Sequence, residues 1–252
     1  MEKISVVVIC LNEEKNIGRC IDSVKGIADE IIILDSYSTD LTVAIAEQKG
    51  ATVIQEIFKG YIQQKNRAID LASHNYVLSL DADEALDPLL TESISRAKKK
   101  FSSPAYRMNR LSNYCGKFIR HGSWYPDAKI RLFDKRVARW GGTNPHDKIV
   151  LTGDLPVQHL KGNILHYSYH SISEHVNQNN KFSSLAAESL FAKGKRTNIF
   201  RIFINPLWAF FQSYLIRAGF LDGLYGFVIA VMIANLTFLK HLKLYLLQQS
   251  AK

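Results

Sequence analysis

The chain has 252 residues, of which 47% are hydrophobic and 22% charged, and this composition excludes a disordered chain, a collagen-like fibre and a polytopic membrane protein. The net charge of +9 indicates a polyanionic partner, such as a nucleic acid, an anionic lipid or a phosphorylated substrate. Residues 95–148 carry more than this whole excess, with 14 Lys and Arg against three Asp. Three cysteines without disulfide or metal-site spacing are typical of a reducing cytoplasm.

Short apolar runs alternate with helical patterns through the first 81 residues. Each run is continuous and rich in β-branched residues, which is typical of a fully buried strand. Strand–helix alternation of this kind predicts an α/β fold with a parallel sheet. Strands are expected at 4–11, 30–34, 51–55 and 76–80, and helices at 17–24, 42–49 and 63–73.

The pattern changes after residue 100. Shorter strands are expected at 105–109, 129–133 and 149–151, followed by a helical segment at 171–196. Residues 199–239 hold only three charged side chains and many Phe, Leu, Ile, Trp and Tyr. This last stretch predicts a hydrophobic helical extension.

Polar clusters follow three of the predicted strands, at 12–14, 35–40 and 81–84. Ligands of open parallel sheets bind beside the carboxyl ends of the strands, so these clusters predict an active site. Helix capping is the alternative explanation for each cluster taken alone.

Asp81 and Asp83 are separated by one residue directly after a predicted strand. Both carboxylates can reach one cation there, and oxygen ligands suit Mg²⁺ or Mn²⁺ together with substrate phosphates. The sequence holds neither a Walker-type loop nor a Gly-x-Gly-x-x-Gly motif. Metal and basic side chains are therefore expected to hold a nucleotide diphosphate.

The ordered motifs VVVICLNEE, ILDSYSTD, QKNRA and LDADE resemble glycosyltransferase family 2 over about the first 150 residues. Later motifs are similar to the branch that includes lipopolysaccharide-core glucosyltransferases: RLF at 131–133, PHD at 145–147, HY at 166–167 and GFLDG at 219–223. The resemblance implies a GT-A fold, which is Rossmann-like with a mostly parallel sheet flanked by helices. It also implies a catalytic domain at 1–170, divided into a nucleotide-sugar half (1–100) and an acceptor-side half (101–170). Residues 171–252 would then form a helical, membrane-associating region.

The resemblance further implies roles for individual residues on the donor side. Asn12 and Glu13 would contact the nucleotide, and Asp35 would read the uracil or the ribose. Lys65 and Asn66 would line the donor site, with Lys65 close to the diphosphate.

A divalent cation, Mg²⁺ or Mn²⁺, is the implied cofactor. Asp83 would be its direct ligand, and Asp81 would face both the ribose and the metal. His166 is a candidate for a further metal or diphosphate contact, with a structural histidine as the alternative. Arg131 would either bind phosphate or anchor a loop.

Inverting transfer also needs a base for the acceptor hydroxyl. The family supplies an acidic or His-Glu pair, and this chain has His146 and Asp147 in its place. We predict Asp147 as the base, with Glu84 or Asp127 as alternatives. A surface ion pair of Asp147 with Lys148 is the non-catalytic explanation.

The apolar C-terminal region has three possible arrangements. Residues 224–239 give a largely apolar, uncharged run of only 16 residues before a lysine, fewer than the roughly 20 that a membrane span needs. A core helix pair, an interfacial helix and a true span all remain open. Flanking basic and aromatic residues favour peripheral or monotopic attachment to the cytoplasmic face of the inner membrane.

Together these features predict a metal-dependent inverting glycosyltransferase that moves glucose from UDP-glucose to a heptose of the lipopolysaccharide inner core. Another UDP-sugar, used in capsule, exopolysaccharide or other cell-envelope glycans, is the alternative. The expected partners are the UDP-sugar, a phosphorylated glycolipid acceptor and an anionic membrane surface, while the oligomeric state stays open. A nucleotidyltransferase is less favoured because an acidic segment follows the first strand, and a nucleic-acid-binding module because carboxylate clusters repel phosphate.

Overall fold

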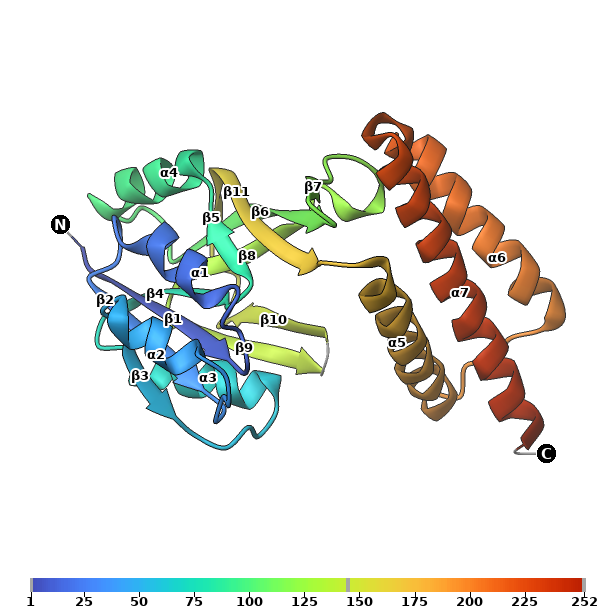
Figure 1. The fold of residues 1–252 in the computed structure, drawn as a ribbon, viewed down its shortest axis with the longest axis horizontal. Coiled ribbons are helices and arrows are strands. Elements are labelled where there is room, and N and C mark those ends of the chain that lie inside the picture. The colour runs from blue at the N-terminus through green and yellow to red at the C-terminus, as the bar shows by residue number, and fades with distance from the viewer. Residues whose placement is uncertain (1, 144–145, 251–252) are drawn as a thin grey trace. The chain divides into compact units, whose positions relative to one another are not determined.

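A computed structural model describes residues 2–143 and 146–250 of the chain (Figure 1). Its contacts divide the chain into two compact units. The first unit holds the described residues of 1–110 and 127–167, and the second holds those of 111–126 and 168–252.

Four parallel strands in the order β3-β2-β1-β4 open the first unit. The register pairs Cys10 of β1 with Asp35 of β2, and Ile9 with Asp81 of β4. Three strands therefore end at the same edge of the sheet. The elements of this part are β1 (Ile4–Cys10), α1 (Ile17–Val24), β2 (Glu30–Asp35), α2 (Thr42–Gln48), β3 (Thr52–Gln55), α3 (Tyr61–Leu71) and β4 (Tyr76–Asp81).

Antiparallel pairing takes over after β4. Strand β8 pairs with β4, β6 pairs with β8, and β5 pairs with β11, while β9 and β10 form a separate two-stranded sheet. The elements are β5 (Glu84–Leu86), α4 (Pro88–Lys98), β6 (Ala105–Tyr114), β7 (Lys117–Phe118), β8 (Ala128–Asp134), β9 (Ala138–Thr143), β10 (His146–Leu151) and β11 (Val157–Tyr169).

Both faces of the sheet are covered by apolar clusters. Because side chains alternate along a strand, Val6 and Val8 of β1 point to one face and Val7 to the other. The Val6 face packs against α1 and α4, and the Val7 face packs against Ile69 of α3 and the ring of Trp140. Burying β1 on both faces explains why its sequence is a continuous apolar run.

A glycine allows β11 to cross the first turn of α4. Gly162 has a φ of +101°, and a Cβ placed on it would lie 2.3 Å from the backbone nitrogen of Leu90. Asp87 caps α4 by accepting a hydrogen bond from the Leu90 N–H at 2.7 Å, and it accepts another from the Asn163 N–H at 2.9 Å. Strand and helix are thus joined where only a glycine fits.

The second unit is mainly helical. Its core brings Tyr114 and Ile119 against Ile229, and α5 and α6 both pack against α7. Buried Asp222 accepts hydrogen bonds from the backbone N–H groups of Arg120 (3.0 Å) and His121 (2.8 Å). The helices are η1 (Gly122–Trp124), α5 (Ile172–Ala192), α6 (Ile199–Phe211), the π-helical turn η2 (Gln212–Ile216), η3 (Gly219–Asp222) and α7 (Leu224–Ser250).

The predicted α/β class, its Rossmann-like start and the hydrophobic helical extension are confirmed. The sequence analysis did not predict β5, α4, the second half of β6, β7, η1, β9 or most of β11. Strand β11 reads VQHLKGNILHYSY, where charged residues and Gly162 interrupt the apolar alternation that marks a strand. Its long extended course depends on pairing partners that are distant in sequence.

Candidate active site

The loops that follow β1, β2 and β4 carry the predicted site residues. Asn12 has a φ of +55°, and its side-chain oxygen accepts a hydrogen bond from the Thr39 N–H at 2.8 Å. The Asn12 N–H donates to the Ser38 hydroxyl, and the Glu13 N–H donates to the hydroxyl of Thr42. The first two loops therefore hold each other in position.

Asp35 is completely buried at the base of these loops. Its carboxylate accepts hydrogen bonds from the Ser38 N–H and from the Gln55 side chain, each at 2.9 Å, and from the Ser38 hydroxyl. Burial by itself would raise the pKa of Asp35, but these hydrogen bonds hold the pKa below its ordinary value. The carboxylate is charged and it shapes the turn at residues 36–40.

Two cations converge on Asp81 at the end of β4. The Lys65 ammonium of α3 lies 2.9 Å from one carboxylate oxygen, and the Arg131 guanidinium of β8 lies 3.0 Å from the other. Burial would raise the pKa of Asp81, yet Arg131 and then Lys65 hold the pKa well below its usual range. Both oxygens of Asp81 are thus engaged by cations of the protein.

Glu84 is a buried member of the same charged cluster. Its side chain is fully buried, accepts a hydrogen bond from the Asp81 N–H at 3.0 Å, and pairs with Arg131 at 2.8 Å. Burial would lower the pKa of Arg131, but Glu84 and Asp81 raise the pKa, so the guanidinium stays charged. The Arg131 Nε is buried and has no hydrogen-bond partner among the residues that the structure describes. The Arg131 Nε–H is therefore a hydrogen-bond donor that no described residue of the cluster uses.

The ring of Trp140 packs against both cations, Lys65 and Arg131. Its ring centroid lies 4.2 Å from the Lys65 ammonium and 5.1 Å from the Arg131 guanidinium carbon. The indole N–H donates to the Ser79 hydroxyl at 3.2 Å. The Asn66 side-chain amide accepts a hydrogen bond from the backbone N–H of Trp140 and donates one to its carbonyl, so Asn66 fixes the position of Trp140.

Asp147, the predicted base, lies beside Lys65. Its carboxylate is 2.8 Å from the Lys65 ammonium and its side chain is 16% exposed. Lys65 therefore bridges Asp81 and Asp147, two residues brought together from β4 and β10. The side chain of His146 and the whole of Pro145, which belong to the same predicted motif, lie outside the described residues.

Asp83 and His166 form a second pair at this edge. The imidazole Nε2 lies 3.2 Å from a carboxylate oxygen of Asp83, and the Tyr167 N–H donates to the Asp83 carbonyl at 3.0 Å. Antiparallel pairing of β5 with β11 creates this neighbourhood, because it sets His166 opposite Glu84. Across residues 2–143 and 146–250 no group of three His, Cys, Asp or Glu side chains could hold a metal ion unaided.

Sequence reasoning did not single out Trp140 or Arg110, and it treated Glu84 only as an alternative base. Arg110 bridges Asp127 at 2.9 Å and Glu84 at 3.7 Å, which connects Asp127 to the cluster. Arg110 lies just past the strand predicted at 105–109, and only the structure places it in the middle of β6. Nothing in the sequence around Trp140 distinguishes it from a core residue.

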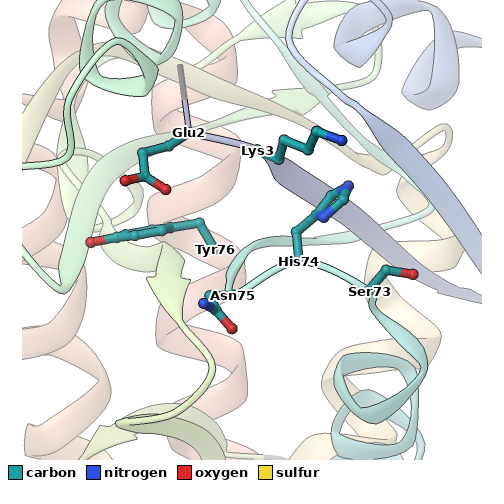
Figure 2. Close-up of a pocket in the computed structure, with 6 residues that line it drawn as sticks. All are labelled: Glu2, Lys3, Ser73, His74, Asn75 and Tyr76. Carbon is teal, nitrogen blue, oxygen red and sulfur yellow. The ribbon is translucent and has the colours of Figure 1, made fainter.

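A pocket of about 260 Å³ lies elsewhere. Figure 2 shows the side chains that line it. Its lining combines Glu2 and Lys3, which precede β1, with 73–76, which lead into β4. Those are the amino ends of the two strands, and the charged cluster lies at their carboxyl ends. The pocket is therefore separate from the candidate active site.

Comparison with known proteins identifies relatives over nearly the whole chain. The family model "Glycosyl transferase family 2" matches residues 5–149. Uncharacterized glycosyltransferases of Rickettsia typhi and Rickettsia felis are 36% and 37% identical to this chain, each over 97% of it and over 87% and 90% of their own lengths. The lipopolysaccharide core biosynthesis glycosyltransferase LpsC of Rhizobium meliloti is 29% identical over 96% of this chain and 92% of its own. Among solved structures, glucosyl-3-phosphoglycerate synthase of Mycobacterium tuberculosis, in complex with Mn²⁺, UDP and glucosyl-3-phosphoglycerate, aligns over 44% of each chain with 28% identity and a TM-score of 0.37.

Proposed function

The chain belongs to glycosyl transferase family 2, and we propose that it moves glucose from UDP-glucose onto a heptose hydroxyl of the lipopolysaccharide inner core. The chain is a glycosyltransferase, and one structural observation is the main support for the proposed reaction. Two buried cations, Lys65 and Arg131, lie among carboxylates at the carboxyl edge of the parallel strands. That edge is where open α/β sheets bind their ligands.

The donor's diphosphate is the group that this cluster suits. Lys65 and Arg131 carry two positive charges, and the buried Arg131 Nε has no hydrogen-bond partner among the described residues. An unpaired buried donor is costly, and a phosphate oxygen would satisfy it. Asn12, Glu13 and Asp35 would build the nucleoside end of the site through their interlocked loops.

Asp83 and His166 would hold the divalent cation, Mg²⁺ or Mn²⁺. An oxygen and an imidazole nitrogen 3.2 Å apart supply two ligands, and diphosphate oxygens and water would complete the shell. Asp81 would act beside this pair rather than within it, because Lys65 and Arg131 already occupy its oxygens. A bound cation would supply Lewis-acid charge to the departing UDP.

Asp147 would accept the proton of the acceptor hydroxyl. The acceptor oxygen then bonds to the anomeric carbon as the bond from that carbon to the diphosphate oxygen breaks, with inversion, and UDP takes the electron pair. Lys65 lies 2.8 Å from Asp147, so the donor's diphosphate would compete with Asp147 for the ammonium. The same lysine would thereby connect donor binding to the base.

The acceptor proposal draws on the relative and on the C-terminal helices. LpsC, whose name refers to lipopolysaccharide core biosynthesis, aligns with nearly the whole of this chain. The helix at 199–216 and α7 (27 residues) are long and apolar enough to cross a membrane, judged by length and composition. A phosphorylated glycolipid at the cytoplasmic face of the inner membrane would suit both these helices and the basic segment 95–148.

A donor screen tests the donor and metal assignments. The full chain with Mn²⁺ should be stabilised against thermal unfolding by UDP-glucose more than by UDP-galactose or UDP-N-acetylglucosamine, and EDTA should remove the effect. Asp83→Ala should lose this stabilisation. Asp70→Ala is the matched control, because Asp70 is a surface residue of α3 that pairs with Arg139. A UDP-glucose response that survives both EDTA and Asp83→Ala would refute the metal site.

Transfer to the acceptor tests the base. With UDP-[14C]glucose and purified inner-core lipopolysaccharide, Asp147→Asn should keep UDP binding but lose about 10²-fold or more in turnover. Unchanged turnover would remove Asp147 from the mechanism. Transfer only to capsule or exopolysaccharide precursors would refute the core acceptor and leave the transferase assignment intact.

A further inference from the structure

Helix α6 presents a broad apolar face to the surroundings. Six side chains, each between 45% and 69% exposed, define what we call the outer face of α6: Phe200, Phe203, Leu207, Trp208, Phe211 and, just beyond it in η2, Leu215. Their spacing of one, three or four residues puts them along one side of the helix. Soluble monomers rarely expose a continuous apolar surface of this length.

Polar groups lie on the opposite side of α6, between the helices. Asn205 of α6 bonds His241 of α7 at 2.9 Å, and Thr197 bonds the other nitrogen of the same imidazole at 3.0 Å. A soluble bundle would bury its apolar side chains and expose its polar ones. On α6 the polar Asn205 faces a neighbouring helix while large apolar side chains stay exposed, which is the arrangement expected of a helix whose outer side is in lipid.

The contacts and charges of helix α5 favour an in-plane arrangement of this bundle over one that crosses the membrane. Asn179 donates to the Met232 carbonyl of α7 at 2.8 Å, and Lys243 of α7 donates to the Asn180 carbonyl at 2.8 Å. Helix α5 therefore accompanies α7 along its middle, and α5 also carries the exposed charges Lys181 and Glu188. A bilayer crossing by α7 would draw those charges into hydrocarbon, which costs several kcal/mol.

The charges around α6 complement an anionic surface. Exposed Lys195 and Arg196 precede the helix, and exposed Arg217 follows η2. Asp222 is the one acidic residue between 199 and 250, and its side chain is buried. Positive charge at both ends and no exposed acid between them favours anionic phospholipid over a second copy of this basic chain.

We propose that the outer face of α6 lies in the plane of one leaflet of an anionic phospholipid bilayer, with both ends of the helix at headgroup level on the same side. This inference rests on the proposed function and deepens it, because it names the surface by which the enzyme meets a membrane-held acceptor. Insertion depth is set by the side chains of Phe200 and Leu207, which are the most exposed of the face.

Vesicle flotation tests the inserted face. The full chain should float with vesicles of phosphatidylcholine and phosphatidylglycerol, and much less with phosphatidylcholine alone. Leu207→Glu should weaken the partition at least about tenfold, since an inserted leucine contributes more than 1 kcal/mol. Leu185→Glu is the matched control on α5, where Leu185 is 41% exposed, and it should float like the unmodified chain. Equal losses in both variants, or in neither, would overturn the proposal.

Cysteine labelling separates the in-plane arrangement from a span. In a Cys115→Ser background, where Cys10 and Cys20 are buried, Arg196→Cys or Arg217→Cys would place one reactive thiol at either end of α6. Both positions should react with a membrane-impermeant maleimide when the protein is bound to intact vesicles. Protection of one end alone would show a crossing helix and overturn the proposal.

Two further readouts separate this inference from the proposed function and from self-association. The UDP-sugar response in solution should be the same for Leu207→Glu and the unmodified chain, so a chain that floats but binds no UDP-sugar refutes only the proposed function. A dimer in solution that Leu207→Glu makes monomeric, without vesicle binding by the unmodified chain, would identify the face as an interface between copies and overturn the membrane assignment.

Discussion

At the scale of single residues, the candidate site depends on an aromatic ring that the motifs do not include. Trp140 faces both Lys65 and Arg131, and Ser79 fixes its indole N–H. Cation–π contacts of this kind contribute about 1 kcal/mol each. The ring therefore helps to hold the Lys65 ammonium and the Arg131 guanidinium in position before any nucleotide-sugar binds.

Trp140→Leu should reduce affinity for UDP roughly 10- to 50-fold, because it removes two cation–π contacts of about 1 kcal/mol each. Trp140→Phe keeps a ring face and should recover most of that affinity. Isothermal titration with UDP and Mn²⁺ measures both variants, with Trp208→Leu as the control on an exposed tryptophan of α6. Equal affinities of the Leu variant and the unmodified chain would show that Trp140 only fills the core.

A second residue makes the stability of the helical unit depend on pH. Buried His175 of α5 lies against the ring of Tyr169, 4.5 Å between centroids, and its Nδ1 is 3.1 Å from the Tyr114 hydroxyl. Burial lowers the pKa of His175 to about 4. The folded state thus keeps His175 neutral in a pH range where the unfolded chain binds a proton.

The contribution of neutral His175 to the free energy of unfolding should therefore be fully present above pH 6.5. It should be lost progressively as the pH drops from 6.5 toward 4. In His175→Gln the loss of unfolding free energy between pH 7 and pH 5 should be smaller by about 1–2 kcal/mol. Urea titrations followed by tryptophan fluorescence measure this difference, and His159→Gln, on an exposed histidine of β11, serves as control. Identical pH dependence with and without His175 would show that the imidazole titrates normally.

At the scale of elements, the β5–β11 pair determines where the candidate metal ligands meet. Asp83 lies directly before β5, and His166 lies on β11, 83 positions along the chain from it. The antiparallel register joins them, and β11 reaches this register only by crossing the first turn of α4 at Gly162. The geometry of the site thus depends on a glycine outside it.

Gly162→Ala should destabilise the chain by roughly 2–4 kcal/mol. The added Cβ would collide with the backbone of Leu90, and the positive φ of residue 162 is unfavourable for alanine. Gly153→Ala is the matched control: Gly153 also has a positive φ, +85°, but open space lies around its Cβ position. That variant should cost only about 1 kcal/mol. Thermal unfolding of both variants gives the comparison, and equal shifts would mean that β11 can move away from α4 without loss.

At the scale of the whole molecule, the C-terminal helices are not a simple appendage. The second unit includes residues 111–126, and its core joins Tyr114 and Ile119 to Ile229 of α7. Asp222 holds the backbone of Arg120 and His121. A truncation of 199–252 would therefore also unfold the segment around β7, so single substitutions on the outer face of α6 are the cleaner test of the proposed membrane binding.

The sequence by itself determined the family, the α/β class and the loops that hold the site. Those features are local: a continuous apolar run predicts a buried strand, and carboxylates directly after such runs must gather where parallel strands end. Asp81, Lys65 and Arg131 were all predicted donor-site residues, and the structure places Lys65 2.9 Å and Arg131 3.0 Å from the carboxylate oxygens of Asp81.

Only the tertiary structure decided which charges pair and which faces are covered. Lys65 bridges Asp81 and Asp147 because β9, the pairing partner of β10, packs against α3, and no spacing in the chain encodes that contact. Trp140 looks like any core tryptophan until Lys65 is packed against it. The sequence left core, interfacial and spanning arrangements of the C-terminal helices open while favouring attachment at the membrane surface, because composition does not say which side of a helix its neighbours cover. Packing of α6 against α7 leaves the outer face of α6 bare.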